Sequence, residues 1–164
     1  MNKKKKSKTL AGRKIKILVV DDHPIVRDGL AELLNHEADF VVCVKAGTAA
    51  EAIKTVKKQR IDLALVDMLL DHTTGVQLIK KIKAICPNII TLVFSMSDKS
   101  QYVKQAIEVG ARGYITKDEI SEEIVNAIRK ILKGHIYISK RLLKNLSKEE
   151  LSDLLADRIQ EGCD

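Results

Sequence analysis

Five short apolar runs, rich in β-branched residues, recur along the chain and constrain its fold more than any other feature. Their apolar residues are continuous rather than alternating, which is typical of strands buried on both faces of a parallel sheet. The runs occupy residues 15–20, 40–44, 63–66, 89–94 and 113–116. A segment with helical spacing follows each of them. This repeated order predicts an α/β fold with right-handed crossovers.

The segments between the runs carry recognisable helix signals. Pro24 suits the first turn of a helix after the first run, and Thr48 with Glu51 three residues later forms a capping-box pattern. Further helices are predicted over residues 76–85, 100–109 and 120–132. After Gly134 the alternation stops. We expect an extended piece at 136–139 and helices at 140–146 and 148–160, the second beginning with another capping box at Ser147 and Glu150.

The charge is distributed unevenly along the chain. Lys and Arg number 29 against 22 acids, for a net charge of +7, a balance that alone favours a nucleic-acid partner. Residues 1–16 hold eight basic residues and no acid, which leaves 21 basic and 22 acidic residues in positions 17–164. The excess therefore belongs to a tail. We predict a basic disordered tail at 1–13, an α/β domain at 14–135 and a helical C-terminal extension at 136–164.

Several classes of protein are disfavoured. No stretch reaches 18 continuous apolar residues, so we expect neither a membrane span nor a secretory signal. The three cysteines lack CxxC spacing, which is typical of reduced thiols in a cytoplasmic protein. The four histidines form no zinc-binding pattern, and aromatic residues make up only 3% of the chain. These features predict a cytoplasmic globular protein.

Polar side chains follow the predicted strands where ligands bind in open α/β sheets. Asp21 and Asp22 follow the first strand, Asp67 the third, Ser95 the fourth and Lys117 the fifth. If the strand order is 2-1-3-4-5, the first and third strands are neighbours and the three carboxylates converge. Single aspartates after strands more often cap helices or begin turns. The five together, in this order, favour a functional site.

Converging carboxylates repel one another and raise each other's pKa unless a cation offsets their charge. Oxygen ligands favour Mg²⁺ over Zn²⁺, with water and a phosphate completing the octahedron. A carboxylate beside Mg²⁺, with a lysine and a hydroxyl opposite, is a set suited to receiving a phosphoryl group.

Four motifs in sequence order resemble those of one known family. They are residues 19–24 (VVDDHP), residues 65–67 (LVD) with Gly75 eight positions after Asp67, residues 94–96 (FSM) and residues 110–118 (GARGYITKD). The ordered set resembles the receiver domains of two-component response regulators, especially of the LuxR/NarL type, over residues 14–139. The resemblance implies a flavodoxin-like, doubly wound, five-stranded parallel sheet with strand order 2-1-3-4-5.

The resemblance also implies a role for each matching residue. Asp67 would be the phospho-acceptor, Ser95 and Lys117 would bind the phosphoryl group, and Tyr114 would be an aromatic switch residue. The implied ligands of Mg²⁺, or of Mn²⁺ in its place, are Asp21, Asp22, Asp67 and the backbone carbonyl of Leu69. The phosphoryl donor would be a sensor histidine kinase or a phosphotransfer protein. The domain would signal rather than act as an enzyme, beyond weak self-phosphorylation and self-dephosphorylation.

The output stays open between two hypotheses. In the first, the chain is a single receiver that switches a protein-interaction surface or forms a homodimer. In the second, it is the receiver part of a LuxR/NarL-type transcription regulator with a truncated output domain. Residues 139–164 are too few for the four helices of that domain, which makes DNA binding doubtful. A dehalogenase-like phosphatase is a third interpretation, but Leu69 stands where its second aspartate is needed.

One position departs from the resemblance. Asp71 stands where receivers usually carry proline. Without proline the loop loses a preset φ angle, and an additional acid close to the phosphate opposes its arrival. We therefore expect slower phosphorylation than in an Asp71→Pro variant.

Overall fold

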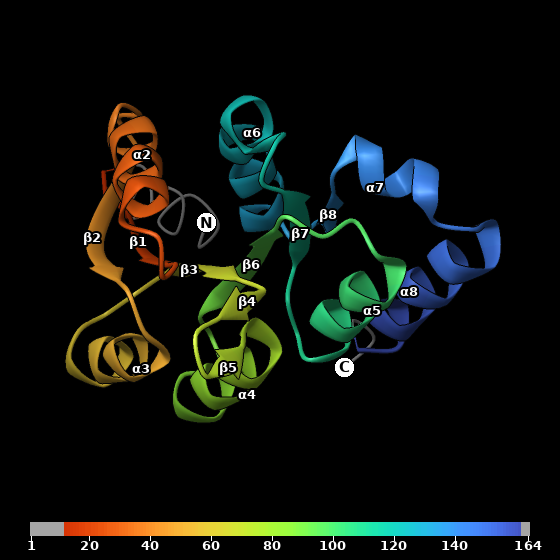
Figure 1. Ribbon diagram of the computed structural model, residues 1–164, viewed down its shortest axis with the longest axis horizontal. Coiled ribbons are helices and arrows are strands. Elements are labelled where there is room, and N and C mark those ends of the chain that lie inside the picture. Colours follow the sequence, from red (N-terminus) through yellow and green to blue (C-terminus); the bar gives the residue numbers. More distant parts are fainter. Residues whose placement is uncertain (1–11, 162–164) are drawn as a thin grey trace, which may run out of the picture.

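The computed structural model describes residues 12–161 (Figure 1). A central sheet separates two layers of helices. Helices α2 (Pro24–Asn35) and α6 (Ile120–Leu132) cover one face. Helices α3 (Ala49–Lys58), α4 (Gly75–Ile85) and α5 (Ser100–Glu108) cover the other. Most of the predicted basic tail, and Cys163, lie outside the described residues.

The sheet confirms the predicted strand order and corrects the predicted number of strands. Six parallel strands are arranged β2-β1-β3-β6-β7-β8. The first five are the predicted runs: β1 (Ile15–Val20), β2 (Phe40–Ala46), β3 (Leu63–Asp67), β6 (Ile90–Ser95) and β7 (Gly113–Thr116). The sixth, β8 (Tyr137–Ile138), falls within the predicted extended piece. Its two residues are too few for an apolar run to mark a strand, but they pair with β7.

Each face of the sheet has its own apolar core. Leu30 and Leu34 of α2 pack with Ile124 and Ile128 of α6 on one face. On the other face the core joins residues of α3, α4 and α5 and extends to Leu154 near the C-terminus. Strands enclosed between two such cores read as continuous apolar runs, which is why the sequence predicts them.

The helices begin where their capping residues predict. The Thr48 hydroxyl accepts a hydrogen bond of 3.2 Å from the Glu51 backbone N–H, and the Glu51 carboxylate accepts one of 2.7 Å from Gly47. At the second predicted capping box, the Ser147 N–H donates to Glu150 at 2.9 Å and the Glu150 N–H donates to the Ser147 hydroxyl at 3.1 Å. Both capping patterns are confirmed.

Two segments lie outside the strand–helix alternation: a short hairpin after Asp67 and two helices after β8. A short hairpin of β4 (Leu69–Leu70) and β5 (Thr73–Thr74), which the sequence does not predict, follows Asp67 and turns at His72 with φ 57°. Helices α7 (Lys140–Asn145) and α8 (Lys148–Glu161) form the extension, in which α7 contacts β7 and α8 contacts α5. Among the described residues, no helix is long and apolar enough to cross a membrane.

Candidate functional site

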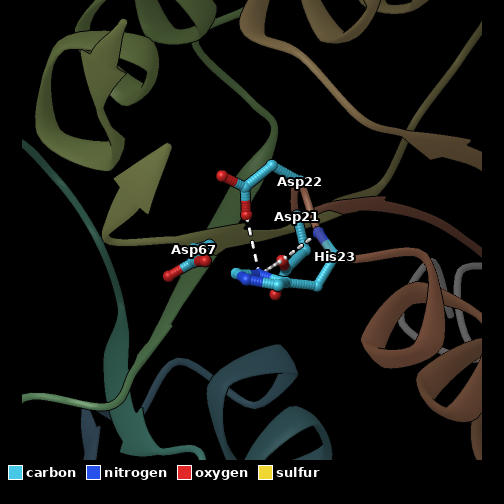
Figure 2. A group of neighbouring side chains, drawn as sticks. All are labelled: Asp21, Asp22, His23 and Asp67. Atoms are coloured by element: carbon cyan, nitrogen blue, oxygen red, sulfur yellow. Dashed lines mark hydrogen bonds and ion pairs between the residues drawn. The ribbon is translucent and has the colours of Figure 1, made fainter. Parts of the chain in front are cut away.

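The three carboxylates predicted to converge do so at the carboxyl edge of the sheet. Strands β1 and β3 are neighbours with Val20 opposite Val66, so Asp21 lies beside Asp67. Both side chains are buried. One ligand atom each from Asp21, Asp22, His23 and Asp67 lies within 4.8 Å of the others, and Figure 2 shows the four side chains around one point. The predicted convergence is confirmed.

Lys117 reaches this cluster from the end of β7. Its Nζ lies 2.9 Å from Asp21 Oδ2 and 2.9 Å from Asp67 Oδ2. Since β6 separates β7 from β3, the side chain has to cross one strand, and its Nζ lies 5.3 Å from the centroid of the Phe94 ring. Burial acts to lower the pKa of Lys117, but the two carboxylates outweigh it and the pKa is raised. The ammonium group is therefore held charged between two buried acids.

The same lysine leaves the two aspartates with different pKa shifts. Burial raises the pKa of Asp67, and the hydrogen bond from Lys117 only partly offsets that rise. Burial acts on Asp21 in the same direction, but hydrogen bonds from Lys117 and from His23 outweigh it, so the pKa of Asp21 is lowered. Asp21 thus keeps its negative charge more readily than Asp67 does.

His23 belongs to the cluster, although the sequence analysis did not select it. Its Nδ1 lies 2.8 Å from Asp22 Oδ1 and 3.0 Å from Asp21 Oδ1, and its backbone N–H donates to Asp21 at 2.8 Å. The hydrogen bond with Asp21 and the charge of Asp22 raise the pKa of His23. The sequence signal that could have indicated this role is the position of His23 directly after the two aspartates. Histidine patterns with zinc spacing do not detect a single histidine of this kind.

The loop after Asp67 brings a further acid to the site. Burial raises the pKa of Asp22, and the nearby carboxylate of Asp71 raises it further. Asp71 is exposed at the turn of the β4–β5 hairpin. The residue in place of the expected proline is therefore a direct neighbour of a predicted metal ligand.

Gly75 lies against the backbone of Asp67 and Met68. A Cβ atom at Gly75 would lie 2.5 Å from the Asp67 carbonyl oxygen and 3.0 Å from the Met68 Cα. The Gly75 N–H donates a hydrogen bond of 2.8 Å to the Met68 carbonyl. Only glycine allows α4 to begin this close to the end of β3.

The remaining predicted site residues lie around Asp67. The Leu69 N–H donates to Asp67 Oδ1 at 3.3 Å, and the Leu69 side chain is exposed. Ser95 is buried at the end of β6, and its Oγ accepts a hydrogen bond of 3.1 Å from the Ser97 N–H. Tyr114 is fully buried, and its hydroxyl donates to the Ser97 carbonyl at 3.0 Å. Burial raises the pKa of Tyr114 to about 12.

The donor set of the cluster fits a hard divalent cation. Three of its four members offer carboxylate oxygens, the ligands that Mg²⁺ and Mn²⁺ prefer. The fourth, His23, has a side chain that is 67% exposed and has room to leave the carboxylates. A bound cation would also offset the mutual repulsion of the three acids.

Comparison with known proteins agrees with this geometry. The family model described as "Response regulator receiver domain" matches residues 17–129, more than half of the chain. The oxygen regulatory protein NreC of Staphylococcus epidermidis is 28% identical over 151 residues, covering 92% of this chain and 69% of that protein. The uncharacterized transcriptional regulatory protein YxjL of Bacillus subtilis is 32% identical over 121 residues, covering 74% of this chain and 56% of that protein.

A solved structure shares both fold and sequence with the chain. The crystal structure of a two-component response regulator of the LuxR family from Aurantimonas has a TM-score of 0.73 and 29% identity, covering 89% of this chain and 99% of that one. The sheet order, the acidic cluster at its carboxyl edge and the family match lead to one conclusion. The chain belongs to the response regulator receiver family of two-component systems, and its relatives are of the LuxR/NarL type.

Proposed function

We propose that Asp67 accepts a phosphoryl group from a phosphohistidine of a sensor histidine kinase or a phosphotransfer protein. The observation that carries this proposal is the buried Lys117 ammonium group, which lies 2.9 Å from both Asp67 and Asp21. This arrangement places a fixed positive charge where the oxygens of an arriving phosphoryl group need one. Asp67 is the acceptor rather than Asp21 because its side chain, at the end of β3, keeps a small exposed area (4%), whereas the side chain of Asp21 has none.

In the transfer step, a carboxylate oxygen of Asp67 attacks the phosphorus atom of the donor. The new P–O bond forms as the P–N bond to the imidazole breaks, and the electron pair of that bond returns to the imidazole nitrogen. The Leu69 N–H and the Lys117 ammonium group hold the two carboxylate oxygens in place. Lys117 then pairs with an oxygen of the transferred group.

Asp21, Asp22 and Asp67 would bind Mg²⁺, or Mn²⁺ in its place, together with the backbone carbonyl of Leu69. When bound, the cation neutralises charge on the equatorial oxygens of the phosphoryl group. Asp22 would give up its contact with His23 to hold the cation, since both would use the same carboxylate. Asp71 opposes the arrival of the phosphate through its negative charge beside Asp22.

Ser95 and Tyr114 would transmit the change. Ser95 ends β6, the strand next to β3, and its hydroxyl is the group that would hydrogen-bond a phosphoryl oxygen. Tyr114 lies on the neighbouring strand β7, and its hydroxyl contacts the segment that follows Ser95. Movement of Ser95 toward the phosphate would therefore shift the Ser97 carbonyl and with it the hydrogen bond that holds the Tyr114 ring. This is a population shift between two states of one surface.

An apolar groove beside the site suits the phosphoryl donor. It has a volume of about 290 Å³, lies between α2 and α6, and is lined at one end by Lys117. Ile25 at its rim is 87% exposed. A helix that carries the donor histidine would bury this side chain while its imidazole points toward Asp67. A homodimer formed through α2 and α6 would cover the groove, so dimerisation through these helices and binding of the phosphoryl donor would exclude one another.

Within the described residues the extension holds two helices, α7 and α8, against the four of the output domain that the resemblance implies.

Intact mass spectrometry after treatment with acetyl phosphate and Mg²⁺ tests the proposal. The wild type should gain one phosphoryl group, and a chelator should prevent it. Asp67→Asn should gain none. Asp71→Asn is the matched control, because it removes an exposed carboxylate on the adjoining hairpin and should keep the adduct. An adduct that persists in Asp67→Asn would overturn the assignment.

A further inference from the structure

Charge is segregated between the two ends of the sheet. The acidic cluster lies at the carboxyl edge, whereas the parallel strands begin, and the helices that lead into them end, at the opposite, amino edge. The exposed basic residues in these last helical turns and in the segments before the strands are Arg13, Lys14, Lys57, Lys58, Arg60, Arg129, Lys130 and Lys133. We call these eight the amino-edge surface. Among the described residues, the exposed acids in the same positions are three: Glu32, Asp39 and Glu108.

Most of the lysines of the amino-edge surface are not neutralised by a neighbouring acid. Within the part of the chain that the structure describes, Lys14, Lys57, Lys58 and Lys133 take part in no ion pair. Arg129 differs, because it forms ion pairs with two acids that lie just before β2. The surface therefore keeps an excess of positive charge.

Helix stability explains only part of this charge. Lysine in the last turn of a helix offsets the partial negative charge of the helix end. That reason applies to Lys57 and Lys58 at the end of α3 and to Lys130 at the end of α6. It does not apply to Lys14 and Arg60, which lie in segments that lead directly into strands.

A hollow at the amino edge collects two arginines. It has a volume of about 550 Å³ and is lined by Arg13, Arg60 and Asp62 together with apolar side chains that include Ile61 and Leu132. The Asp62 carboxylate lies 3.0 Å from the Arg13 guanidinium group and 3.3 Å from that of Arg60. Because two cations share one anion, one positive charge is left over. Both arginine side chains remain accessible, with 38% and 62% of their surface exposed.

The basic N-terminal tail is attached at the same edge. Strand β1 begins at Ile15, and Arg13, two residues earlier, already lines the hollow. Residues 1–11, which lie outside the described residues, contain five lysines and no acid. The tail thus adds positive charge to the end of the domain that already carries an excess of it.

We propose that the amino-edge surface and the basic tail together bind the anionic surface of a lipid bilayer. The basic residues come from α3 on one face of the sheet, from α6 on the other face and from the segments between them (Figure 1). They are therefore spread over an area, which a planar bilayer can contact at once. Each lysine or arginine close to anionic lipids adds to the affinity. A headgroup phosphate that enters the hollow meets two guanidinium groups, the preferred partners of phosphate.

The same features fit a nucleic acid less well. Phosphates of nucleic acids bind at helix N-termini, and sequence is read by elements that enter a groove. The amino edge presents helix C-termini and short segments before strands instead. Single strands are bound by stacking on aromatic side chains. All five aromatic residues of the chain lie within the described residues, and none of them is exposed.

Membrane binding does not depend on the proposed phosphorylation. Asp67 ends β3 at the carboxyl edge, and Arg60 and Asp62 precede the same strand at the amino edge. A domain bound to a bilayer through the amino-edge surface therefore presents Asp67 on the side that faces away from the lipid. Failure of either proposal leaves the other standing.

Co-sedimentation of the full chain with lipid vesicles tests the inference. Wild type should bind vesicles of phosphatidylcholine and phosphatidylglycerol at physiological salt and should not bind vesicles of phosphatidylcholine alone. The double variant Lys57→Gln, Lys133→Gln should bind about 25-fold more weakly, because each lysine contributes about fivefold. The matched control is Lys99→Gln, Lys140→Gln, which removes two exposed lysines at the carboxyl edge and should bind as wild type does.

Three outcomes of this experiment would overturn the proposal. The first is a wild type that does not bind the anionic vesicles. The second is an equal loss in the two double variants, because net charge rather than the amino-edge surface would then decide binding. The third is a loss confined to a variant in which Lys3, Lys4, Lys5 and Lys6 are changed to Gln, because the tail would then act alone.

Two further measurements locate the contact and identify the partner. Hydrogen exchange of residues 59–62 and 86–90, which line the hollow, should slow on anionic vesicles, whereas exchange of residues 96–100 at the carboxyl edge should not change. The reverse pattern would contradict the assigned surface. Fluorescence anisotropy with a mixed-sequence DNA duplex should show little binding at physiological salt. Duplex binding that persists there and is lost in Lys57→Gln, Lys133→Gln would assign the surface to nucleic acid instead.

Discussion

The carboxyl edge of the sheet and the C-terminal extension both hold charged pairs, but they bury them to different extents. At the edge, the side chains of Lys117, Asp21 and Asp67 are 12%, 0% and 4% exposed. In the extension, Arg141 and its partner Asp118 are 55% and 49% exposed. Buried charges are costly to desolvate and are strongly unfavourable without a partner, whereas exposed pairs contribute little. The edge thus holds its charged groups buried and paired, whereas this charged pair of the extension lies at the surface.

The largest effect is expected from removing the Lys117 ammonium group from the buried cluster. Lys117→Ala removes the ammonium group that both buried carboxylates contact and should lower the free energy of unfolding by about 3 kcal/mol in the absence of metal. Urea denaturation with a chelator present measures it. Lys45→Ala breaks an exposed pair with Asp28 and is the control, with an expected loss of less than about 1 kcal/mol. Equal losses in the two variants would contradict the contrast between buried and exposed charge.

The next effect concerns the backbone at the acceptor. Gly75→Ala forces a Cβ atom against the Asp67 carbonyl and should cost about 1–3 kcal/mol of stability, with slower phosphorylation because Asp67 is displaced. Gly29→Ala in α2 is the matched control. Its Cβ meets nothing within 4 Å, so it should stabilise the protein by about 0.5–1 kcal/mol. Thermal unfolding measures the stability of both variants. Stabilisation by Gly75→Ala would show that the Asp67 backbone does not crowd a side chain at this position.

A smaller effect is expected at Asp71. Asp71→Asn removes a negative charge beside Asp22 and should accelerate phosphorylation by acetyl phosphate about fivefold, the equivalent of about 1 kcal/mol. Asp71→Pro also fixes the loop and should be at least as fast. If only the proline variant is faster, loop stiffness rather than charge limits the reaction. If neither is faster than wild type, Asp71 does not oppose the phosphate.

The exposed pair of the extension should contribute little to stability. Arg141→Ala should lower the free energy of unfolding by less than about 1 kcal/mol. Denaturation under the conditions used for Lys117→Ala allows a direct comparison. A loss as large as that of Lys117→Ala would contradict the expected difference between buried and exposed charged pairs.

The smallest effect is a local pH dependence at the start of α8. The hydrogen bond from the Ser147 N–H lowers the pKa of Glu150 below its ordinary value of 4.5. The stability from this lowered pKa is present above that ordinary value and is lost as the pH falls through the lower pKa of the folded state. NMR shifts of the Ser147 and Glu150 amides should follow this loss. Glu150→Gln keeps the cap acceptor and should abolish the titration. A titration that persists in that variant would assign it to another group.

The comparison of the two regions also shows what sequence alone can predict. The sheet order and the convergence of Asp21, Asp22 and Asp67 follow from continuous apolar runs and from what directly follows them, both of which are local signals. Strand β8 and the β4–β5 hairpin are two-residue elements without a periodic pattern. His23 belongs to no paired-histidine pattern, and its contacts with Asp21 and Asp22 depend on the local backbone after β1. The contact of α8 with α5 depends on packing between distant segments, which no local pattern contains.

Chemical mapping of the phosphorylated residue tests the central claim most directly. Borohydride reduces an aspartyl phosphate to homoserine and releases phosphate, so the acceptor carries a permanent mark. Wild-type protein treated with acetyl phosphate and Mg²⁺, reduced and then analysed by peptide mass spectrometry should carry homoserine at position 67 only, and untreated protein should carry none. Homoserine at position 21, 22 or 71 would contradict the assignment of Asp67 as the acceptor.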